Sequence, residues 1–354
     1  MANIDRRQFL KLCTASAAAV GLSQLWVPAI GEAYRKAAGG NPPIIWIQGS
    51  ACNGCSTSLV NTVHPDMREL LSEIIDLSFH PGLSSGAGNL FIDGLYRIAT
   101  ENKGKFILVV EGAIPLAHKG ALNTIGEDSS GKAVTLIDLL KNISGSARFI
   151  IAVGSCASFG GISAAEPNYA ECVGLEKFIE VNKVINIPGC PPHPDWIVGT
   201  LAHLLLYGPP VLDDYGRPKM FYGGLIHNNC PRRQYFDNSI FAKNFGEDGC
   251  LLYLGCKGPL AHGDCPTRLW NSTSSWCVDV NAPCIGCTDP SFPDLTMPFY
   301  KRMPEIKGPG ITSTADAIGI GLGVATAAGL GAHLAGNYFT GRIGPRKHKE
   351  EEDV

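Results

Sequence analysis

Cysteine is the residue type in this sequence with the greatest capacity for chemistry. The chain has 354 residues and 13 cysteines, and a cysteine thiolate can act as a nucleophile, a metal ligand or a partner in a disulfide. The odd number and the Cys-x-x-Cys spacing argue against a framework made of disulfides alone. Thiolate ligands for iron–sulfur clusters fit the number and the spacing better.

Four cysteines come directly after expected β-strands. Cys52 and Cys55 follow the first strand, Cys156 follows the fourth and Cys190 follows the fifth. Because sites in an open α/β sheet form beyond the carboxyl ends of its strands, these four thiolates would meet at one edge. Structural zinc is an alternative, although zinc sites usually pair two short Cys-x-x-Cys knuckles. Dithiol redox chemistry at Cys52 and Cys55 would leave the other two cysteines without a role.

A second group combines one histidine with three cysteines within thirty residues. It consists of His227, Cys230, Cys250 and Cys256. An imidazole in place of one thiolate makes an iron–sulfur cluster less negative and can raise its potential. We therefore interpret His227 as a ligand.

A third group lies further along the chain, and its size depends on one residue. Cys265, Cys284 and Cys287 provide three ligands. With Cys277 the group would hold a 4Fe–4S cluster, and without it a 3Fe–4S cluster. Cys172 is left without a role, and we expect it to be a buried free thiol.

The elements that must position these residues alternate between strand and helix from residue 41 to residue 208. This alternation predicts a parallel, doubly wound α/β sheet. The expected strands are Ile44–Gln48, Asp76–His80, Phe106–Glu111, Arg148–Val153 and Val184–Pro188, and the expected helices are Arg68–Ile75, Leu90–Asn102, Val134–Asn142, Leu175–Asn182 and Trp196–Tyr207. Residues 209–308 lack such patterns and predict a loop-rich iron–sulfur domain.

The N-terminal residues 1–38 resemble a twin-arginine export signal. Arg6 and Arg7 precede Phe-Leu-Lys and a weakly apolar, alanine-rich stretch. This export route carries folded proteins, so a protein with its clusters already inserted could leave the cytoplasm. Cys13 would be removed with the signal.

Residues 315–341 predict a C-terminal transmembrane helix. The run from Ala317 to Phe339 carries no charge and is long enough to cross a bilayer. Basic residues follow it, which would keep the tail in the cytoplasm and the main body on the periplasmic face of the cell membrane. A buried, glycine-rich helix of a soluble domain is the alternative. His333 within this run could meet a haem of a partner.

The overall charge argues against one class of partner. The formal net charge is −3, and charged residues make up 17% of the chain. Without a basic surface or a long basic run, nucleic acid is not an expected partner.

Together these features resemble the small subunit of nickel–iron hydrogenases over nearly the whole chain. The resemblance implies a flavodoxin-like first domain and three iron–sulfur clusters in a row. We call the implied ligand groups the proximal set, the medial set and the distal set. The proximal set is Cys52, Cys55, Cys156 and Cys190. The medial set is Cys265, Cys284 and Cys287, which Cys277 joins if the medial cluster is 4Fe–4S rather than 3Fe–4S. The distal set is His227, Cys230, Cys250 and Cys256.

The resemblance also implies what the chain does. A large-subunit partner would hold nickel and iron and split hydrogen, while this chain would conduct the electrons to a membrane cytochrome b or another quinone-linked subunit. The chain lacks the nickel-binding pattern itself, because Cys55 is followed by Ser-Thr-Ser and Cys287 by Thr-Asp-Pro. By resemblance Glu111 would lie on a proton route near the subunit interface, or would pair structurally.

Three positions distinguish this chain within the family. Many members have proline after the tryptophan that precedes the medial Cys-x-x-Cys, whereas here Trp276 is followed by Cys277. This resembles members whose medial cluster is 4Fe–4S, and we expect 4Fe–4S clusters in the proximal and distal sets as well. Oxygen-tolerant members carry two extra cysteines near the proximal cluster, where this chain has Gly54 and Gly161. We therefore expect a four-cysteine proximal cluster and an enzyme that oxygen inhibits.

Two other readings remain. One is an iron–sulfur subunit of another membrane oxidoreductase, such as the related quinone-reductase subunit, which has adjacent cysteines at its first cluster site and lacks the second domain. The other is an exported binding protein stabilised by zinc or disulfides.

Overall fold

The structure is a computed structural model that describes residues 42–179, 184–301, 306–308, 311–313 and 315–343. The chain divides into two compact units, Met1–Lys301 and Arg302–Val354. The expected export signal, with Arg6, Arg7 and Cys13, lies outside the described residues.

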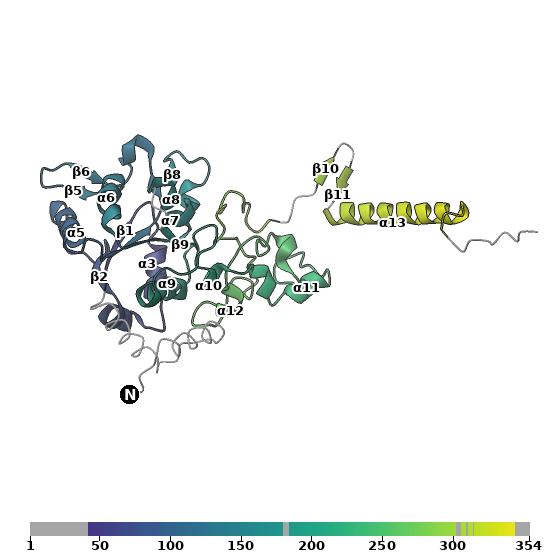
Figure 1. Cartoon of the computed structure of the whole chain (residues 1–354), viewed down its shortest axis with the longest axis horizontal. Coiled ribbons are helices and arrows are strands. Elements are labelled where there is room, and N and C mark those ends of the chain that lie inside the picture. Colours follow the sequence, from purple (N-terminus) through teal and green to yellow (C-terminus); the bar gives the residue numbers. More distant parts are fainter. Residues whose placement is uncertain (1–41, 180–183, 302–305, 309–310, 314, 344–354) are drawn as a thin grey trace, which may run out of the picture. The chain divides into compact units, whose positions relative to one another are not determined.

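A five-stranded parallel sheet forms the centre of the first unit (Figure 1). Its order is β2-β1-β3-β7-β9, which is the strand order of a flavodoxin-like sheet. The strands are β1 (Pro43–Gln48), β2 (Asp76–Phe79), β3 (Ile107–Glu111), β7 (Phe149–Val153) and β9 (Val184–Ile187). All four neighbouring pairs are parallel, so the predicted sheet is confirmed.

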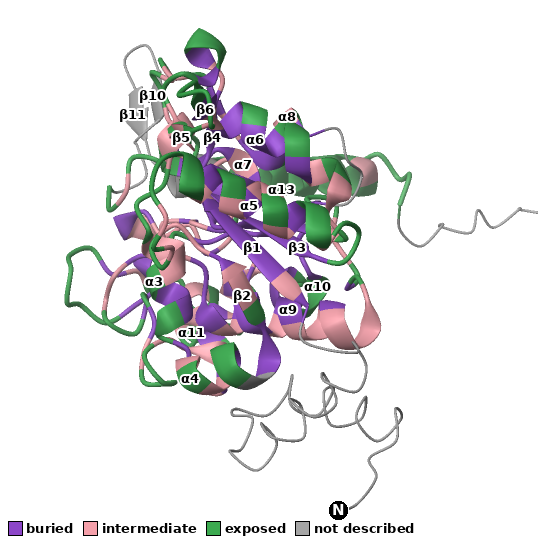
Figure 2. Cartoon of the chain, turned by 90° about the vertical axis from the view of Figure 1, so that its left-hand side faces the viewer, coloured by how far each residue is buried: buried purple, intermediate pink, exposed green. Residues whose placement is uncertain are grey.

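The sheet is buried on both faces because its strands are almost continuously apolar. Alternate residues enter two separate cores: Ile44 and Trp46 pack in one, and Ile45 and Ile47 pack in the other. Helices α3 (Gly54–Val60) and α9 (Pro194–Tyr207) cover the first face, and helices α5 (Asn89–Glu101) and α6 (Leu136–Ile143) cover the second. In Figure 2 the central strands β1 and β3 are buried along most of their length.

All five expected helices have somewhat different bounds in the structure; those over 68–75, 134–142 and 175–182 change in kind or length, and residues 180–182 lie outside the described part. Arg68–Ile75 is a short α-helix, α4 (Met67–Glu69), that continues as a π-helix over Leu70–Ile74. Val134 belongs to strand β6 (Ala133–Thr135), and α6 begins only after Thr135, whose hydroxyl caps it by accepting from the Asp138 N–H at 3.2 Å. Helix α8 covers Leu175–Phe178, and Ile179 is extended.

Two small antiparallel pairs accompany the main sheet and were not predicted. Strand β5 (Thr124–Glu127) pairs with β6, and β4 (Ile114–Pro115) pairs with β8 (Cys172–Val173). The second pair connects the segment after β3 to the segment after α7 (Ser155–Phe159). Both segments lie next to residues of the proximal set.

Residues 209–301 have little regular structure, as the sequence predicts. The helices here are short: α10 (Lys219–Tyr222), α11 (Arg233–Asp237), α12 (Cys265–Arg268) and 3₁₀ turns at Ile226–Asn229 and Leu251–Leu254. Their apolar residues share a core with the sheet, since Leu251, Trp276 and Trp196 of α9 belong to one buried cluster. The predicted division after residue 208 stays a prediction.

The second unit contains a short hairpin and a long helix. Strands β10 (Ile306–Gly308) and β11 (Ile311–Ser313) pair antiparallel, and α13 covers Ala315–Phe339. Within the described parts of the chain, no helix has both the length and the apolar character needed to cross a membrane. The predicted membrane span over 315–341 is therefore not supported. Glycines recur along α13, and it carries the polar pair His333 and Asn337, whose side chains meet at 2.9 Å.

Three candidate iron–sulfur centres

The proximal set forms at the carboxyl edge of the sheet, as predicted. Cys52 and Cys55 follow β1, Cys156 lies in α7 directly after β7, and Cys190 follows β9. Burial and then the charges of Glu111 and the other three cysteines raise the pKa of the Cys55 thiol far above its usual range. The Cys190 residue is exposed, but partial desolvation of its thiol, and then the charges of Cys156 and Cys52, raise its pKa to about 11.

These pKa shifts show what the proximal set can bind. Four thiolates at one edge repel one another, so they can coexist only around positive charge. Iron supplies that charge and thiolate is its usual cluster ligand, so the donor set fits a four-cysteine cluster.

Glycines let the backbone pass close to the proximal thiols. Gly154 has φ +90°, and a Cβ there would lie 2.4 Å from Cys55 Sγ. A Cβ at Gly54 would lie 3.1 Å from Cys52 Sγ. Any side chain at Gly154 would therefore displace a ligand of this set.

Glu111 is buried at the end of β3 and accepts five hydrogen bonds. Its Oε1 accepts from the backbone N–H groups of Cys55 (3.1 Å) and Ser56 (3.3 Å). Its Oε2 accepts from Trp46 Nε1 (3.0 Å), Gln48 Nε2 (3.3 Å) and the Ser56 hydroxyl. The carboxylate thus holds the turn that carries Cys55. This is the structural role that the sequence offered as the alternative to a proton route. A proton route through Glu111 stays a prediction.

The network extends from Glu111 to a histidine that sequence reasoning missed. His80 Nδ1 accepts from the Gly82 N–H at 3.0 Å, so in the neutral ring the proton is on Nε2. His80 Nε2 lies 3.0 Å from the Ser56 hydroxyl, which in turn donates to Glu111. Nothing in the local sequence pattern marks His80, because only the pairing of β1 with β2 brings it to this site.

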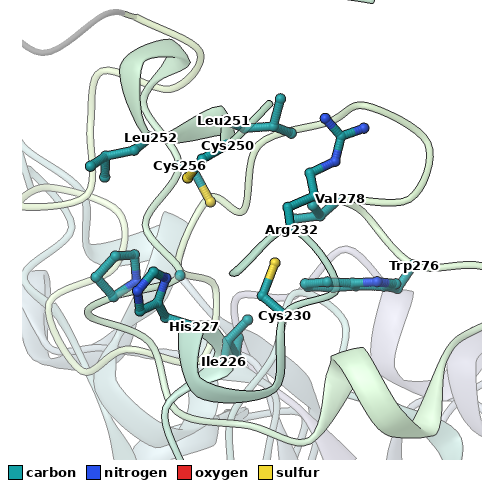
Figure 3. A pocket seen from close by; sticks show the side chains of 12 residues that line it. Ile226, His227, Cys230, Arg232, Cys250, Leu251, Leu252, Cys256, Trp276 and Val278 are labelled. Atoms are coloured by element: carbon teal, nitrogen blue, oxygen red, sulfur yellow. The ribbon is translucent and has the colours of Figure 1, made fainter. Parts of the chain in front are cut away.

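The distal set surrounds a pocket (Figure 3). His227, Cys230, Cys250 and Cys256 all line it, as the sequence predicts, together with apolar residues that include Leu251 and Trp276. Burial raises the pKa of Cys230, Cys250 and Cys256. Burial and then Arg233 lower the pKa of His227, which favours the neutral imidazole needed for a metal ligand.

Arg232 is a residue of the distal pocket that the sequence did not reveal. Its Nη1 donates to the Gly249 carbonyl at 2.8 Å and its Nη2 to Asn281 Oδ1 at 2.5 Å. The guanidinium charge favours the thiolates, since it acts to lower the pKa of Cys230, Cys250 and Cys256 against the larger effect of burial. A lone arginine in a loop carries no sequence signal for this role.

Electrostatics links Cys277 to the medial set and also to Cys256 of the distal set. Burial raises the pKa of Cys265 well above its usual range, with further contributions that include Cys287 and Cys277. Burial also raises the pKa of Cys287 to about 12, and the Cys277 charge adds to that rise. The pKa of Cys284 is raised by burial and then by neighbours that include Cys287 and Cys265. Among the described residues, no three Cys, His, Asp or Glu side chains lie close enough to share a single metal ion.

Cys172 is a buried free thiol, as predicted. It lies in β8, its Sγ is 4.0 Å from the Ser50 hydroxyl, and burial raises its pKa. It lies beside the loop that leads to Cys52, and the charge of Cys156 adds to the rise in its pKa.

Comparison with known proteins agrees with this architecture. Residues 222–300 match the family model for the C-terminal part of the NiFe/NiFeSe hydrogenase small subunit, and residues 52–204 match NADH ubiquinone oxidoreductase, 20 Kd subunit. The chain is 44% identical over 313 residues to the periplasmic [NiFeSe] hydrogenase small subunit of Desulfomicrobium baculatum, an alignment that spans 84% of this chain and 99% of that protein. It is 39% identical over 293 residues to the hydrogenase-2 small chain of Escherichia coli, an alignment that spans 81% of this chain and 77% of that protein.

Solved structures show the same likeness. A reduced, active Ni-Fe-Se hydrogenase from Desulfomicrobium baculatum superposes with a TM-score of 0.72 at 44% identity, covering 74% of this chain and 100% of that chain. An actinobacterial-type NiFe-hydrogenase from Ralstonia eutropha superposes with a TM-score of 0.69 at 28% identity, covering 90% of this chain and 97% of that chain.

A flavodoxin-like sheet joined to a cysteine-rich, loop-built segment defines an iron–sulfur electron-transfer subunit. The match to the 20 Kd subunit extends over the sheet alone, whereas the hydrogenase relatives match both segments. The chain belongs to the family of NiFe/NiFeSe hydrogenase small subunits, and it is the electron-transfer subunit of such an oxidoreductase.

Proposed function

We propose that this chain conducts electrons between a hydrogen-splitting large subunit and an acceptor through three iron–sulfur clusters, held by the proximal, medial and distal sets. When bound, the clusters accept and donate single electrons. The observation that carries the proposal is the contact between successive sets. Ser155, directly before the proximal Cys156, donates through its hydroxyl to the backbone carbonyl of the medial Cys287. The Lys257 N–H, directly after the distal Cys256, donates to the backbone carbonyl of the medial Cys284 at 2.7 Å.

Iron and sulfide analysis of the purified complex, together with visible absorption, tests the proposal. We expect iron and sulfide for three clusters in the small subunit. A colourless protein that contains zinc would instead support the exported binding protein held together by zinc or disulfides.

We further propose that all three clusters are 4Fe–4S and that Cys277 is the fourth medial ligand. The support is electrostatic, because the Cys277 charge acts on both Cys265 and Cys287. Low-temperature electron paramagnetic resonance (EPR) of mildly oxidised protein tests this. A stoichiometric 3Fe–4S signal in the native complex would show that Cys277 is not a ligand.

The proximal cluster would have four cysteine ligands and the enzyme would be inhibited by oxygen. Extra thiols are absent at Gly54 and Gly161, and Gly161 has φ +48° with a would-be Cβ only 2.7 Å from the Cys156 nitrogen. A cysteine could not replace Gly161 here without moving the Cys156 backbone. Sustained hydrogen oxidation in air by the purified complex would contradict this proposal.

The partner we propose is a nickel–iron large subunit that docks over the proximal set. Cys52 and Cys190 are exposed, and the exposed apolar side chains Ile162 and Tyr169 follow Cys156 in the sequence. Exposed apolar groups beside a conducting site are typical of a surface that a partner protein buries. Cross-linking in the intact complex tests this: contacts should map to the segment 50–56 and to 160–170.

We propose a periplasmic location, reached through the twin-arginine signal over residues 1–38. Two relatives that support it are named as periplasmic hydrogenase subunits. The acceptor would be a membrane cytochrome b or another quinone-linked subunit that meets the distal set. Cell fractionation tests the location, and reduction of a copurifying haem by hydrogen tests the acceptor.

A further inference from the structure

Ser155 makes an unusual set of contacts for a single small side chain. It is the first residue of α7, next to the proximal ligand Cys156, and it is only 1% exposed. Its backbone N–H donates to the Gly189 carbonyl at 3.0 Å, and its hydroxyl accepts from the Gly189 N–H at 2.9 Å. The same hydroxyl donates to the backbone carbonyl of Cys287.

These contacts join three loops, and each loop carries a proposed cluster ligand. Ser155 precedes Cys156, Gly189 precedes Cys190, and Cys287 belongs to the medial set. One hydroxyl therefore links the proximal set to the medial set. The loop with Cys287 is also held from its other side, because buried Arg217 donates through Nη1 to the Thr288 carbonyl at 3.0 Å.

The contact between the medial set and the distal set has a related form but uses only backbone. The Lys257 N–H, directly after the distal ligand Cys256, donates to the carbonyl of the medial ligand Cys284 at 2.7 Å. In both contacts the backbone carbonyl of a medial cysteine accepts a hydrogen bond. The donor is in each case the residue next in sequence to a cysteine of another set. At Ser155 the donor is a side-chain hydroxyl rather than a backbone N–H. The contact between the proximal set and the medial set can therefore be altered by substitution.

We propose that Ser155 is a positioning residue that holds the proximal and medial ligand loops together and thereby sets the rate of electron exchange between them. The inference rests on the proposed function, since it assumes clusters in both sets. Electron exchange weakens steeply as two centres separate. Without the hydroxyl, the buried Gly189 N–H and Cys287 carbonyl lose this partner, and the loops must shift to find others.

The intact complex with Ser155→Ala tests the proposal, and Ser158→Ala is the matched control. Ser158 lies in the same helix and is 2% exposed, but its hydroxyl donates to the Ala152 carbonyl at 3.4 Å, away from the ligand loops. The measurements are iron content, the EPR splitting between the reduced proximal and medial clusters, the medial midpoint potential, and freeze-quench reduction by hydrogen. Ser155→Thr, which keeps the hydroxyl, provides the rescue.

Ser155→Ala should keep its iron but show a smaller splitting and a shifted medial potential, because the loop that carries Cys287 loses its hydrogen bond to Ser155 and moves. Reduction of the medial cluster by hydrogen should be slower than in the wild type, because electron exchange weakens steeply as the two ligand loops move apart. Ser158→Ala and Ser155→Thr should behave as wild type.

Wild-type splitting, potential and rate in Ser155→Ala would overturn the proposal, as would identical losses in Ser155→Ala and Ser158→Ala. If Ser155→Ala does not assemble, assembly of Ser155→Thr with wild-type splitting supports the proposal, and failure of both overturns it. A wild-type complex without iron in the medial set would instead refute the proposed function, so the two failures are distinguishable.

Discussion

Replacing Glu111 tests whether its carboxylate positions the proximal ligands. Glu111 is 1% exposed and accepts five hydrogen bonds, two of them from the backbone N–H groups of Cys55 and Ser56. In Glu111→Gln the new amide group can still accept through its oxygen, but its NH₂ must face donors such as Trp46 Nε1. The substitution therefore creates a buried pair of donors with no acceptor between them.

The size of the effect follows from those contacts. Leaving one buried donor unsatisfied costs about 1–3 kcal/mol, so Glu111→Gln should lower the unfolding free energy by roughly that amount. Glu111→Ala should cost more, about 3–5 kcal/mol, because it leaves the Trp46 indole and two backbone N–H groups without an acceptor. The proximal potential should rise in both variants, since a negative charge beside Cys55 is lost.

Thermal unfolding of the complex and EPR-monitored redox titration of the proximal cluster measure the two effects. Glu176→Gln is the control, because this carboxylate also accepts a side-chain hydrogen bond, from Asn186 Nδ2 at 2.9 Å, but belongs to none of the contacts of the proximal set. The control should leave the proximal potential unchanged. If Glu111→Gln matched the wild type in both stability and potential, the assignment of Glu111 as the support of the Cys55 turn would be wrong.

Three further predictions concern other parts of the site. Cys277→Ser should convert the medial cluster to 3Fe–4S and produce a stoichiometric EPR signal on mild oxidation, whereas Cys172→Ser should not; equal signals would refute the ligand assignment. Gly154→Ala should reduce the iron content of the proximal set, because its Cβ would lie 2.4 Å from a ligand sulfur at φ +90°, while Gly145→Ala, in open space, should retain full iron. Burial lowers the pKa of His80, so the unfolded chain binds more protons and stability should fall as pH drops below about 6.5. His80→Gln should make stability less dependent on pH, as measured by thermal unfolding from pH 5 to 8. An unchanged pH dependence would argue against this role of His80.

The sequence alone specified the chemistry and the order of the main elements. Apolar runs such as Ile44–Gln48 and the intervening helical patterns predicted a parallel sheet, because strands buried on both faces must be almost wholly apolar. A parallel sheet in turn places Cys52, Cys156 and Cys190 at one edge, since every strand ends there. The distal group could be proposed because its four candidate ligands lie within thirty residues of one another.

Local boundaries and the C-terminal helix were less predictable. Val134 reads as the start of an amphipathic helix, but pairing of β6 with β5 makes it a strand residue and Thr135 the helix cap. Long-range pairing overrides local propensity in such cases. The uncharged run before Arg342 forms a helix as expected, but no helix in the described parts of the chain is both long enough and apolar enough to cross a membrane.

Contacts between distant segments were decided by the tertiary structure alone. Glu111 meets the Cys55 turn because β1 and β3 are neighbours, and Cys277 acts on Cys265 and Cys287 because loops without regular structure fold over one another. Ser155 meets Cys287 across 132 positions of sequence. Residue type and spacing determine which atoms can bind iron, since thiolate chemistry is local. Which hydrogen bonds hold those thiolates, and how the three sets meet, depends on packing that no local pattern encodes.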